Sequence, residues 1–136
     1  MIKAINRDIS ILSKASRPAG IMDLGIAKNL EDTLSANSDF CVGMAANMIG
    51  ELKRIIVFDS DRTYVTMFNP EIISCSGKYA VEEGCLSLSG VRKTARYRRI
   101  TVKYQDKNFK WHEEEFEGFT AEIIQHEIDH CNGILI

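Results

Sequence analysis

Two histidines and a glutamate near the end of the chain form its most chemically informative pattern. They lie in Gln125-His126-Glu127-Ile128-Asp129-His130, which contains the spacing H-E-x-x-H. Residues four apart on a helix lie roughly 5 to 6 Å from one another on one face, so His126 and His130 can share one cation. Glu127 then leans over the open coordination position, as in hydrolytic metal sites. The spacing therefore predicts a metal-dependent hydrolase.

The predicted metal needs a third protein ligand, because catalytic sites usually carry three such ligands and a water. The candidate is Cys85, inside Glu83-Gly84-Cys85-Leu86-Ser87. An isolated cysteine is most often a small buried apolar residue, but this one stands between Gly84 and Leu86 in a polar stretch, which favours a thiolate ligand. None of the cysteines forms a C-x-x-C pair, so we expect reduced thiols rather than a disulfide framework. The four are Cys41, Cys75, Cys85 and Cys131.

A helix can also contain H-E-x-x-H by chance, with both histidines simply packed or exposed. The chain has 3 histidines, and two of them fall in this motif. The surrounding segment is apolar nearly all round, with Ile124, Ile128 and Cys131 on one stripe, which predicts a buried helix. Two buried imidazoles without partners would be costly, so the metal interpretation is favoured. The remaining histidine, His112, is predicted to lie on a strand face.

Composition is typical of a soluble globular domain. The 136 residues fit one domain, of which about two-thirds of the unfolded surface can be buried. The content is 45% hydrophobic and 26% charged, and the net charge of -2 gives no electrostatic reason to expect a nucleic-acid partner. No run approaches the roughly 18 apolar residues of a membrane span, and the N-terminus has no secretory pattern. We expect a single cytoplasmic domain over residues 1–136.

The elements that must position the motif are predicted from periodicity. Ile26, Leu30 and Leu34 recur every four residues, which predicts a helix over 23–36 with Asp23 as its cap. The small and apolar residues of 41–48 fit either a tightly packed helix start or an edge lying against an extended peptide, which Gly43 would allow to approach closely. Spacing alone leaves both alternatives open.

The middle of the chain has the short alternating runs of antiparallel strands. The runs at 54–58 and 64–68 predict a hairpin, and two further short strands are expected on either side of Cys75-Ser76-Gly77. After the cysteine motif, Ile100, Val102 and Tyr104 alternate with polar residues. The expected strands after the hairpin are 71–74, 78–82, one through 100–104, and 109–116. Thr120 is then expected to cap the helix that carries the histidines.

Three stretches together resemble the three motifs of the peptide deformylases. Residues 43–48 are similar to the first motif, G-x-A-A-x-Q; residues 83–87 match the second, E-G-C-L-S; residues 125–130 match the third, Q-H-E-x-D-H. Each motif alone has modest specificity, but the three occur in the family order and span most of the chain. The resemblance implies an α+β fold in which short antiparallel β-sheets surround a central helix with the metal-binding histidines.

The resemblance also implies the reaction, which is hydrolysis of the formyl group from the N-terminal formyl-methionine of newly made proteins. A divalent ion on Cys85, His126 and His130 would lower the pKa of its bound water toward about 7. Glu127 would accept that proton and return it to the leaving amine, while the backbone N–H of Leu86 holds the developing oxyanion. In the family the ion in cells is usually ferrous iron, and zinc, nickel or cobalt can replace it; thiolate ligation is compatible with iron or zinc.

Two residues depart from the family pattern. The glutamine whose amide helps hold the oxyanion is replaced by Met48, and a thioether has no proton to donate. Losing one such donor costs other hydrolases on the order of 100 to 1,000-fold in rate, so either the enzyme is slow or a substitute such as Asn47 or a water takes over. Cys41 stands where the family often has glycine. With Gly43, Met48 is expected to contact the substrate.

The partners implied are N-formylmethionyl nascent peptides, with transient proximity to the ribosome. The long C-terminal helix of many family members is not expected, since only six residues follow His130. No nucleic-acid or membrane partner is expected. Two alternatives stay open at this point: a catalytically weakened formyl-peptide-binding member of the family, and a zincin-type metallopeptidase, which typically takes its third ligand from further along the chain.

Overall fold

The fold is one antiparallel sheet with two substantial helices, described in a computed structural model for residues 1–61 and 63–136. The five strands follow one another in the order β1-β2-β3-β4-β5. They are β1 (Gly43–Ala45), β2 (Ile55–Ser60), β3 (Thr63–Cys85), β4 (Leu88–Gln105) and β5 (Trp111–Glu117). The helices are α1 (Ile9–Leu12), α2 (Leu24–Ala36) and α3 (Gly118–Cys131), and two 3-10 turns, η1 (Ile21–Asp23) and η2 (Ala46–Ile49), complete the fold. The α+β class is confirmed.

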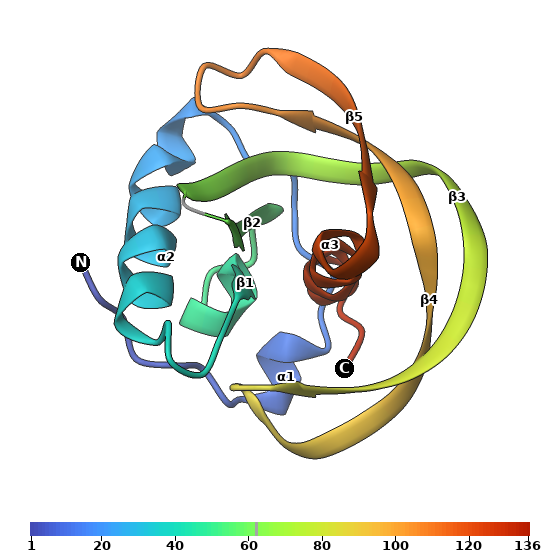
Figure 1. The fold of residues 1–136 in the computed structure, drawn as a ribbon. Coiled ribbons are helices and arrows are strands. Elements are labelled where there is room, and N and C mark those ends of the chain that lie inside the picture. The colour runs from blue at the N-terminus through green and yellow to red at the C-terminus, as the bar shows by residue number, and fades with distance from the viewer. Residues whose placement is uncertain (62) are drawn as a thin grey trace.

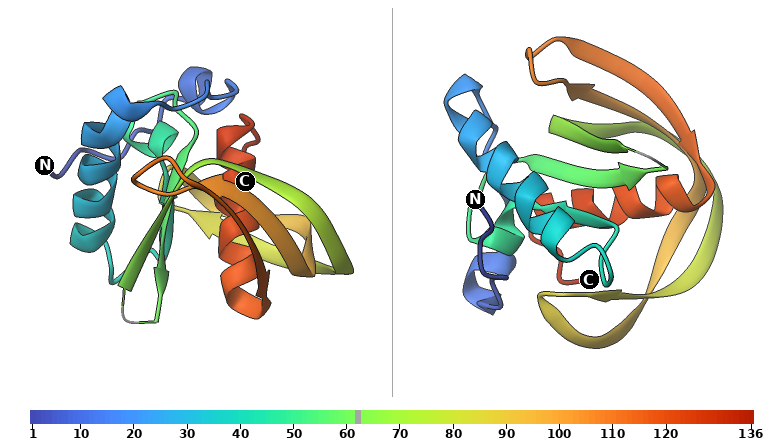
Figure 2. Two further views of the ribbon diagram at one scale, coloured as in Figure 1. Left: turned by 90° about the horizontal axis from the view of Figure 1, so that it is seen from above. Right: turned by 60° about the vertical axis from the view of Figure 1, so that its left-hand side comes forward.

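The first part of the sheet lies between the two helices (Figure 2). Strands β2 and β3 form the predicted hairpin, with Ile55 opposite Phe68 and Ser60 opposite Thr63. On one face, α2 buries Leu30 and Leu34. Its first residue follows Asp23 as predicted, but the Asp23 carboxylate accepts a hydrogen bond from the backbone N–H of Gly20 rather than from the helix.

The prediction of separate short strands at 71–74 and 78–82 was wrong, and so was the prediction of several small sheets. Strand β3 runs through both segments for 23 residues, paired with β4 for most of its length. Register shifts between Phe68 and Glu71 and between Ile72 and Ser74 bend it instead of ending it. Gly77 takes a φ of 76° within the strand, and a glycine at such a position marks a bend rather than a break.

The bent arm formed by β3 and β4 wraps around α3, which is seen nearly end-on in Figure 1. Inside the arm, Ile100, Val102, Ile124 and Ile128 belong to one buried cluster with Cys131. Helix α3 is therefore enclosed on most sides, as its apolar residues predicted.

The boundaries of two elements differ from the sequence prediction. The last strand begins at Trp111 rather than at Phe109, which takes a positive φ of 59° in the preceding turn. Thr120 does not cap α3, because the helix already begins at Gly118 with Glu117 as its N-cap residue. The chain passes directly from β5 into α3, so no separate capping segment is needed. His112 lies exposed on β5 and contacts Asp106, as expected of a strand-face residue.

Candidate active site

The three predicted metal ligands converge although they come from distant parts of the chain. Cys85 is the last residue of β3, and His126 and His130 lie one turn apart on α3. One ligand atom from each side chain can be chosen so that all three lie within 4.8 Å of one another. The two imidazole ring centroids are 4.7 Å apart. This is the three-residue donor set that a tetrahedral or five-coordinate hydrolytic ion requires.

Cys85 is held at this point by the tight turn between β3 and β4. The turn consists of Leu86 and Ser87, and Cys85 pairs with Leu88 across it. The backbone N–H of Ser87 donates a hydrogen bond to the Cys85 sulfur at 3.4 Å. A backbone N–H directed at sulfur stabilises the thiolate, which is the form that binds a metal.

The burial of His130 and Glu127 gives each of them an unusual pKa. Burial in α3 raises the pKa of the Glu127 carboxyl to about 7. Burial lowers the pKa of His130 to about 4, and the neighbouring His126 contributes in the same direction. Near neutral pH, His130 is therefore the neutral imidazole that metals bind.

Two buried atoms at the centre of the site have no hydrogen-bond partner among the protein atoms of the described residues. They are Glu127 Oε1 and His130 Nδ1, which lie 3.5 Å apart. Burying polar atoms in this way is costly unless something else satisfies them. A cation could accept the lone pair of His130 Nδ1, and a water bound to that cation could donate a hydrogen bond to Glu127 Oε1. The donor set therefore fits a divalent metal.

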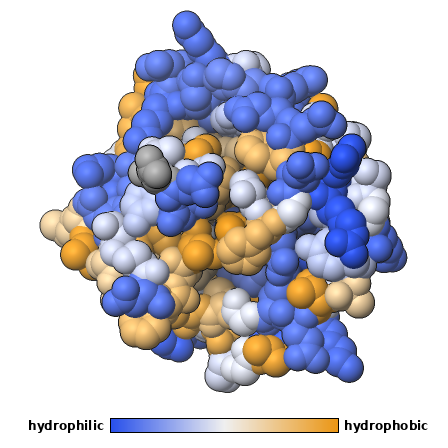
Figure 3. Space-filling model, viewed as in Figure 1, coloured by the Kyte–Doolittle hydropathy of each residue, from blue (hydrophilic) through white to orange (hydrophobic). Residues whose placement is uncertain are grey.

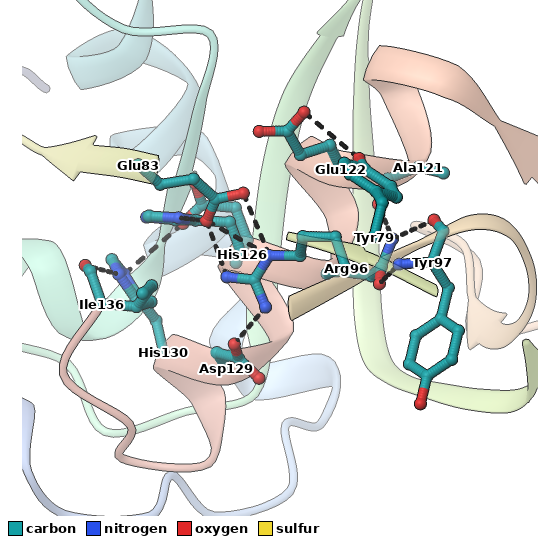
Figure 4. A network of polar contacts seen from close by, with 12 residues as sticks. Tyr79, Glu83, Arg96, Tyr97, Ala121, Glu122, His126, Asp129, His130 and Ile136 are labelled. Atoms are coloured by element: carbon teal, nitrogen blue, oxygen red, sulfur yellow. Dashed lines mark hydrogen bonds and ion pairs between the residues drawn. The ribbon is translucent and has the colours of Figure 1, made fainter. Parts of the chain in front are cut away.

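A buried ionic network fixes the orientation of His126, and Figure 4 shows its members around the imidazole. Glu83 Oε1 contacts His126 Nδ1 at 2.8 Å, leaving the other ring nitrogen for a ligand. Arg96 binds both oxygens of Glu83, at 2.7 and 3.0 Å, and reaches Asp129 at 2.6 Å. A carboxylate that contacts the second nitrogen of a ligating imidazole fixes the orientation of its ring. Glu83 and Arg96 can therefore orient His126 without being metal ligands themselves.

The charges in this network set the pKa of both partners. Burial alone would raise the pKa of Glu83, but the hydrogen bonds from His126 and Arg96 outweigh it and lower that pKa to about 2. Burial likewise opposes protonation of His126, while contacts with Cys85 and Glu83 raise its pKa to about 10. A metal ion bound to this imidazole would displace its proton.

Gln125 connects α3 to the arm that carries Arg96. Its side-chain oxygen accepts a hydrogen bond from the backbone N–H of Tyr97 at 2.8 Å, and its nitrogen donates to the Tyr97 carbonyl at 2.8 Å. The same nitrogen also reaches the Ala121 carbonyl. The glutamine of the third motif therefore clamps β4 against the helix, a role that sequence reasoning did not assign.

A cavity of about 560 Å³ is lined by two of the predicted ligands, Cys85 and His126. Its walls come from the segment before β1, the β3–β4 turn and the first turns of α3. Apolar and acidic side chains line it, and no lysine or arginine of residues 1–61 and 63–136 does. The lining includes Phe40, Cys41, Val42, Gly43, Met48, Glu82, Glu83, Cys85, Leu86, Phe119, Glu122, Ile123, His126 and Glu127. In the same view as Figure 1, apolar residues gather in the middle of this face, with hydrophilic ones along its upper and right edges (Figure 3).

Besides Cys85 and His126, four residues predicted from the motifs line this cavity, and one alternative does not. Gly43, Met48, Leu86 and Glu127 all border it. Asn47, considered as a substitute donor for the missing glutamine, points elsewhere: its amide nitrogen donates to the His130 carbonyl at 3.0 Å. The interpretation of Asn47 as an oxyanion donor is therefore wrong, because consecutive residues of η2 face different sides.

Comparison with known proteins agrees with this geometry. The sequence model of the polypeptide deformylase family matches residues 3–136. The chain belongs to the polypeptide deformylase family. A peptide deformylase from Clostridium beijerinckii is 51% identical over 136 residues, covering 100% of both chains. One from Thermotoga maritima is 37% identical, over 93% of this chain and 79% of the relative.

Solved deformylase structures have the same fold. The Thermotoga maritima peptide deformylase structure superposes with a TM-score of 0.89 at 33% identity, covering 99% of this chain and 95% of that one. The actinonin-bound class I type b enzyme from Acinetobacter baumannii gives 0.88 at 31% identity, with coverage of 99% and 95%.

Family membership establishes the general activity. Peptide deformylases are hydrolases that remove the N-formyl group from nascent peptides, and this chain is an enzyme of that kind. The zincin-type alternative is thereby excluded. The family is metal-dependent, in agreement with the Cys/His/His cluster. Within residues 1–61 and 63–136, no helix has the length and apolar character needed to span a membrane.

Proposed function

We propose that Cys85, His126 and His130 hold one divalent cation, ferrous iron in cells, which zinc, nickel or cobalt can replace. The observation that carries the proposal is the meeting of these three donors within 4.8 Å. The mixed sulfur and nitrogen set suits iron or zinc and disfavours hard ions such as Mg²⁺. Glu83 then acts on the second nitrogen of His126, and Arg96 keeps Glu83 ionised in a buried position.

Glu127 is the general base and acid of the proposed reaction. When bound, the ion acts as a Lewis acid that makes a water acidic and polarises the formyl oxygen. The Glu127 carboxyl, with a pKa raised by burial, can hold a proton near neutral pH and give it to the leaving amine. It lies next to His126 in α3 but is not a member of the ligand set.

Leu86 supplies its backbone N–H to the developing oxyanion. It is the residue after Cys85 in the tight turn, so its position is fixed by the same turn that holds the sulfur. Met48 lines the cavity where the family has a glutamine donor, and the residue is 1% exposed. With Asn47 bound to the His130 carbonyl, the proposed oxyanion site has one protein donor fewer than the family pattern.

The substrate is an N-formylmethionyl nascent peptide bound along β1. Strand β1 lies at the edge of the sheet, where an extended peptide can add main-chain hydrogen bonds. Gly43 begins this edge, and its lack of a side chain lets Ile123 and Glu127 of α3 lie close to the strand. The apolar side chains of Val42, Phe119 and Ile123 provide surfaces for a methionine side chain. An Acinetobacter baumannii relative with a TM-score of 0.89 was solved with Met-Ala-Ser bound.

The proposed setting is cytoplasmic, with residues 1–136 forming a single catalytic domain that acts close to the ribosome. The alternative of a weakened, formyl-peptide-binding family member rests on Met48 alone. Turnover separates the two, because a binding protein would retain affinity for the peptide without releasing formate.

The test is deformylation of formyl-Met-Ala-Ser by iron-loaded protein under anaerobic conditions, followed as formate release. We expect about one metal ion per chain and multiple turnovers. Cys85→Ala should lose the metal, whereas Cys75→Ala, whose thiol is exposed on the arm, should keep it. Glu127→Ala should keep the metal and lose most turnover. Full metal content in Cys85→Ala would refute the ligand assignment, and an active Glu127→Ala would refute the base.

A further inference from the structure

A second, much smaller cavity lies beside the proposed metal site. Its volume is about 10 Å³, and four apolar side chains form most of its wall: Leu12, Leu88, Ile134 and Leu135. The other three lining residues are polar: Asn47, Ser87 and His130. Asn47 and Ser87 do not border the large cavity. Each of the three polar residues belongs to a different one of the three sequence motifs. The motifs therefore meet at this small cavity as well as at the large cavity proposed for the substrate.

The polar residues of this cavity have unsatisfied atoms. Asn47 Oδ1 and Ser87 Oγ are buried without a hydrogen-bond partner among the protein atoms of the described residues, and the residues are 1% and 4% exposed. The amide nitrogen of Asn47 is already bound to the His130 carbonyl, so turning the amide over would only exchange one unsatisfied atom for another. A buried group left unpaired costs about 1–3 kcal/mol, and two of them lining one cavity call for a common partner.

We propose that this cavity binds one water molecule, which links Asn47 and Ser87. A cavity needs about 10–15 Å³ to hold one water, and the water needs two to four polar partners; both conditions are met. A water can donate to Asn47 Oδ1 and either donate to or accept from the Ser87 hydroxyl. Empty cavities of native proteins are apolar, whereas Asn47 and Ser87 line this one and each has an unsatisfied oxygen.

The bound water would make Asn47 and Ser87 positioning residues for the metal centre, an inference that rests on the proposed ligand set. Ser87 already directs its backbone N–H at the Cys85 sulfur. Asn47 already donates a hydrogen bond to the main chain of another proposed ligand, His130. A water that bridges Asn47 and Ser87 would connect the β3–β4 turn to the C-terminal end of α3. The distance between the Cys85 sulfur and the His130 imidazole would then not depend on the turn alone. The four apolar side chains around it keep this water from rapid exchange.

The water itself is tested by a crystal structure of the wild-type protein at a resolution that shows ordered solvent. We expect one water within hydrogen-bond distance of both Asn47 Oδ1 and Ser87 Oγ. An empty cavity, or a direct hydrogen bond between these two side chains, would overturn the proposal. This measurement does not depend on activity or on metal content, so it can fail while the proposed function stands.

The positioning role is tested with Ser87→Ala, which removes only the hydroxyl, against Ser89→Ala two residues further on, whose side chain is exposed. Loss of groups that support metal ligands typically weakens metal binding 10 to 100-fold. We therefore expect chelator-driven loss of cobalt to be roughly 10-fold faster in Ser87→Ala, with a shifted thiolate-to-cobalt charge-transfer band. Ser89→Ala should match wild type in both. An unchanged band and an unchanged rate of cobalt loss in Ser87→Ala would refute the role.

Discussion

Adding one methyl group at Gly43 should damage the active site more than the fold. A Cβ built at this residue would lie 2.7 Å from Cγ2 of Ile123, 3.2 Å from Oε2 of Glu127 and 3.3 Å from Cγ of Glu127. Carbon atoms pack at about 3.5–4.0 Å, so β1 and α3 must separate by about 1 Å. Ile123 cannot turn aside easily, because β-branched side chains in helices have one preferred rotamer.

The size of the effect follows from that displacement. Overpacking a buried contact typically costs about 1–3 kcal/mol, and moving a catalytic group by about 1 Å can cost on the order of 100-fold in rate. For Gly43→Ala we expect kcat to fall on the order of 100-fold while the metal is retained. The assay is formate release from formyl-Met-Ala-Ser, with metal content and thermal unfolding measured on the same samples.

Two further variants decide whether the contact is the cause. Gly25→Ala in α2 has no heavy atom within 4 Å of the added Cβ, so it should keep full activity and gain up to about 1 kcal/mol of stability. Combining Gly43→Ala with Ile123→Ala removes the closest contact, and the loss caused by Gly43→Ala should be smaller in that background. Wild-type turnover in Gly43→Ala would refute the steric argument.

Other changes test different parts of the structure. Arg96→Met leaves Glu83 buried without its partner, so the protein should lose about 3–5 kcal/mol of unfolding free energy in denaturant titrations; a loss below 1 kcal/mol would contradict the network. Met48→Gln restores an amide donor and should raise kcat on the order of tenfold; no gain in kcat would contradict the view that the site lacks this donor. Cys131 has a pKa raised by burial to about 12, so at pH 8 its thiolate fraction is about 10⁻⁴ and alkylation should be confined to exposed thiols such as Cys75; rapid labelling of Cys131 by mass spectrometry in the folded protein would contradict its burial. Gly133→Ala would set a Cβ 2.7 Å from the Ser13 carbonyl oxygen, at a φ of 76°, and should lower the melting temperature by more than Gly25→Ala raises it.

The residues proposed for metal binding and catalysis could be predicted from the sequence, but the ion pair that orients His126 could not. Cys85, His126, Glu127 and His130 could be named because spacing along one helix and one polar turn is a local property. The ion-pair partner of Glu83 could not be predicted. Arg96 lies 13 residues further along the chain, and only the register of the β3–β4 hairpin brings it to Glu83.

The same limit explains the errors in the fold. The segment around Gly77 has the composition of a turn, and only the long partner strand keeps it extended. Asn47 and Met48 are neighbours in sequence, and nothing local indicates that one faces the substrate cavity while the other faces the helix end. Such outcomes depend on tertiary contacts that override local preference.

The two hydrogen bonds between Gln125 and Tyr97 also favour one register of β4 against β3. Side chains alternate between the two faces of a strand, so sliding β4 by a single residue against β3 would turn every inward residue outward. Arg96 would then leave the interior, and Glu83 would stay buried beside His126 with no guanidinium. Gln125 forms hydrogen bonds with both the N–H and the carbonyl of one residue of β4, Tyr97. In a shifted strand a different residue would lie opposite Gln125, and its N–H and carbonyl would be displaced along the strand. A misaligned arm would thus lose the Gln125–Tyr97 hydrogen bonds and the Glu83–Arg96 ion pair together, and the proposed metal ligands can assemble only on a correctly aligned hairpin.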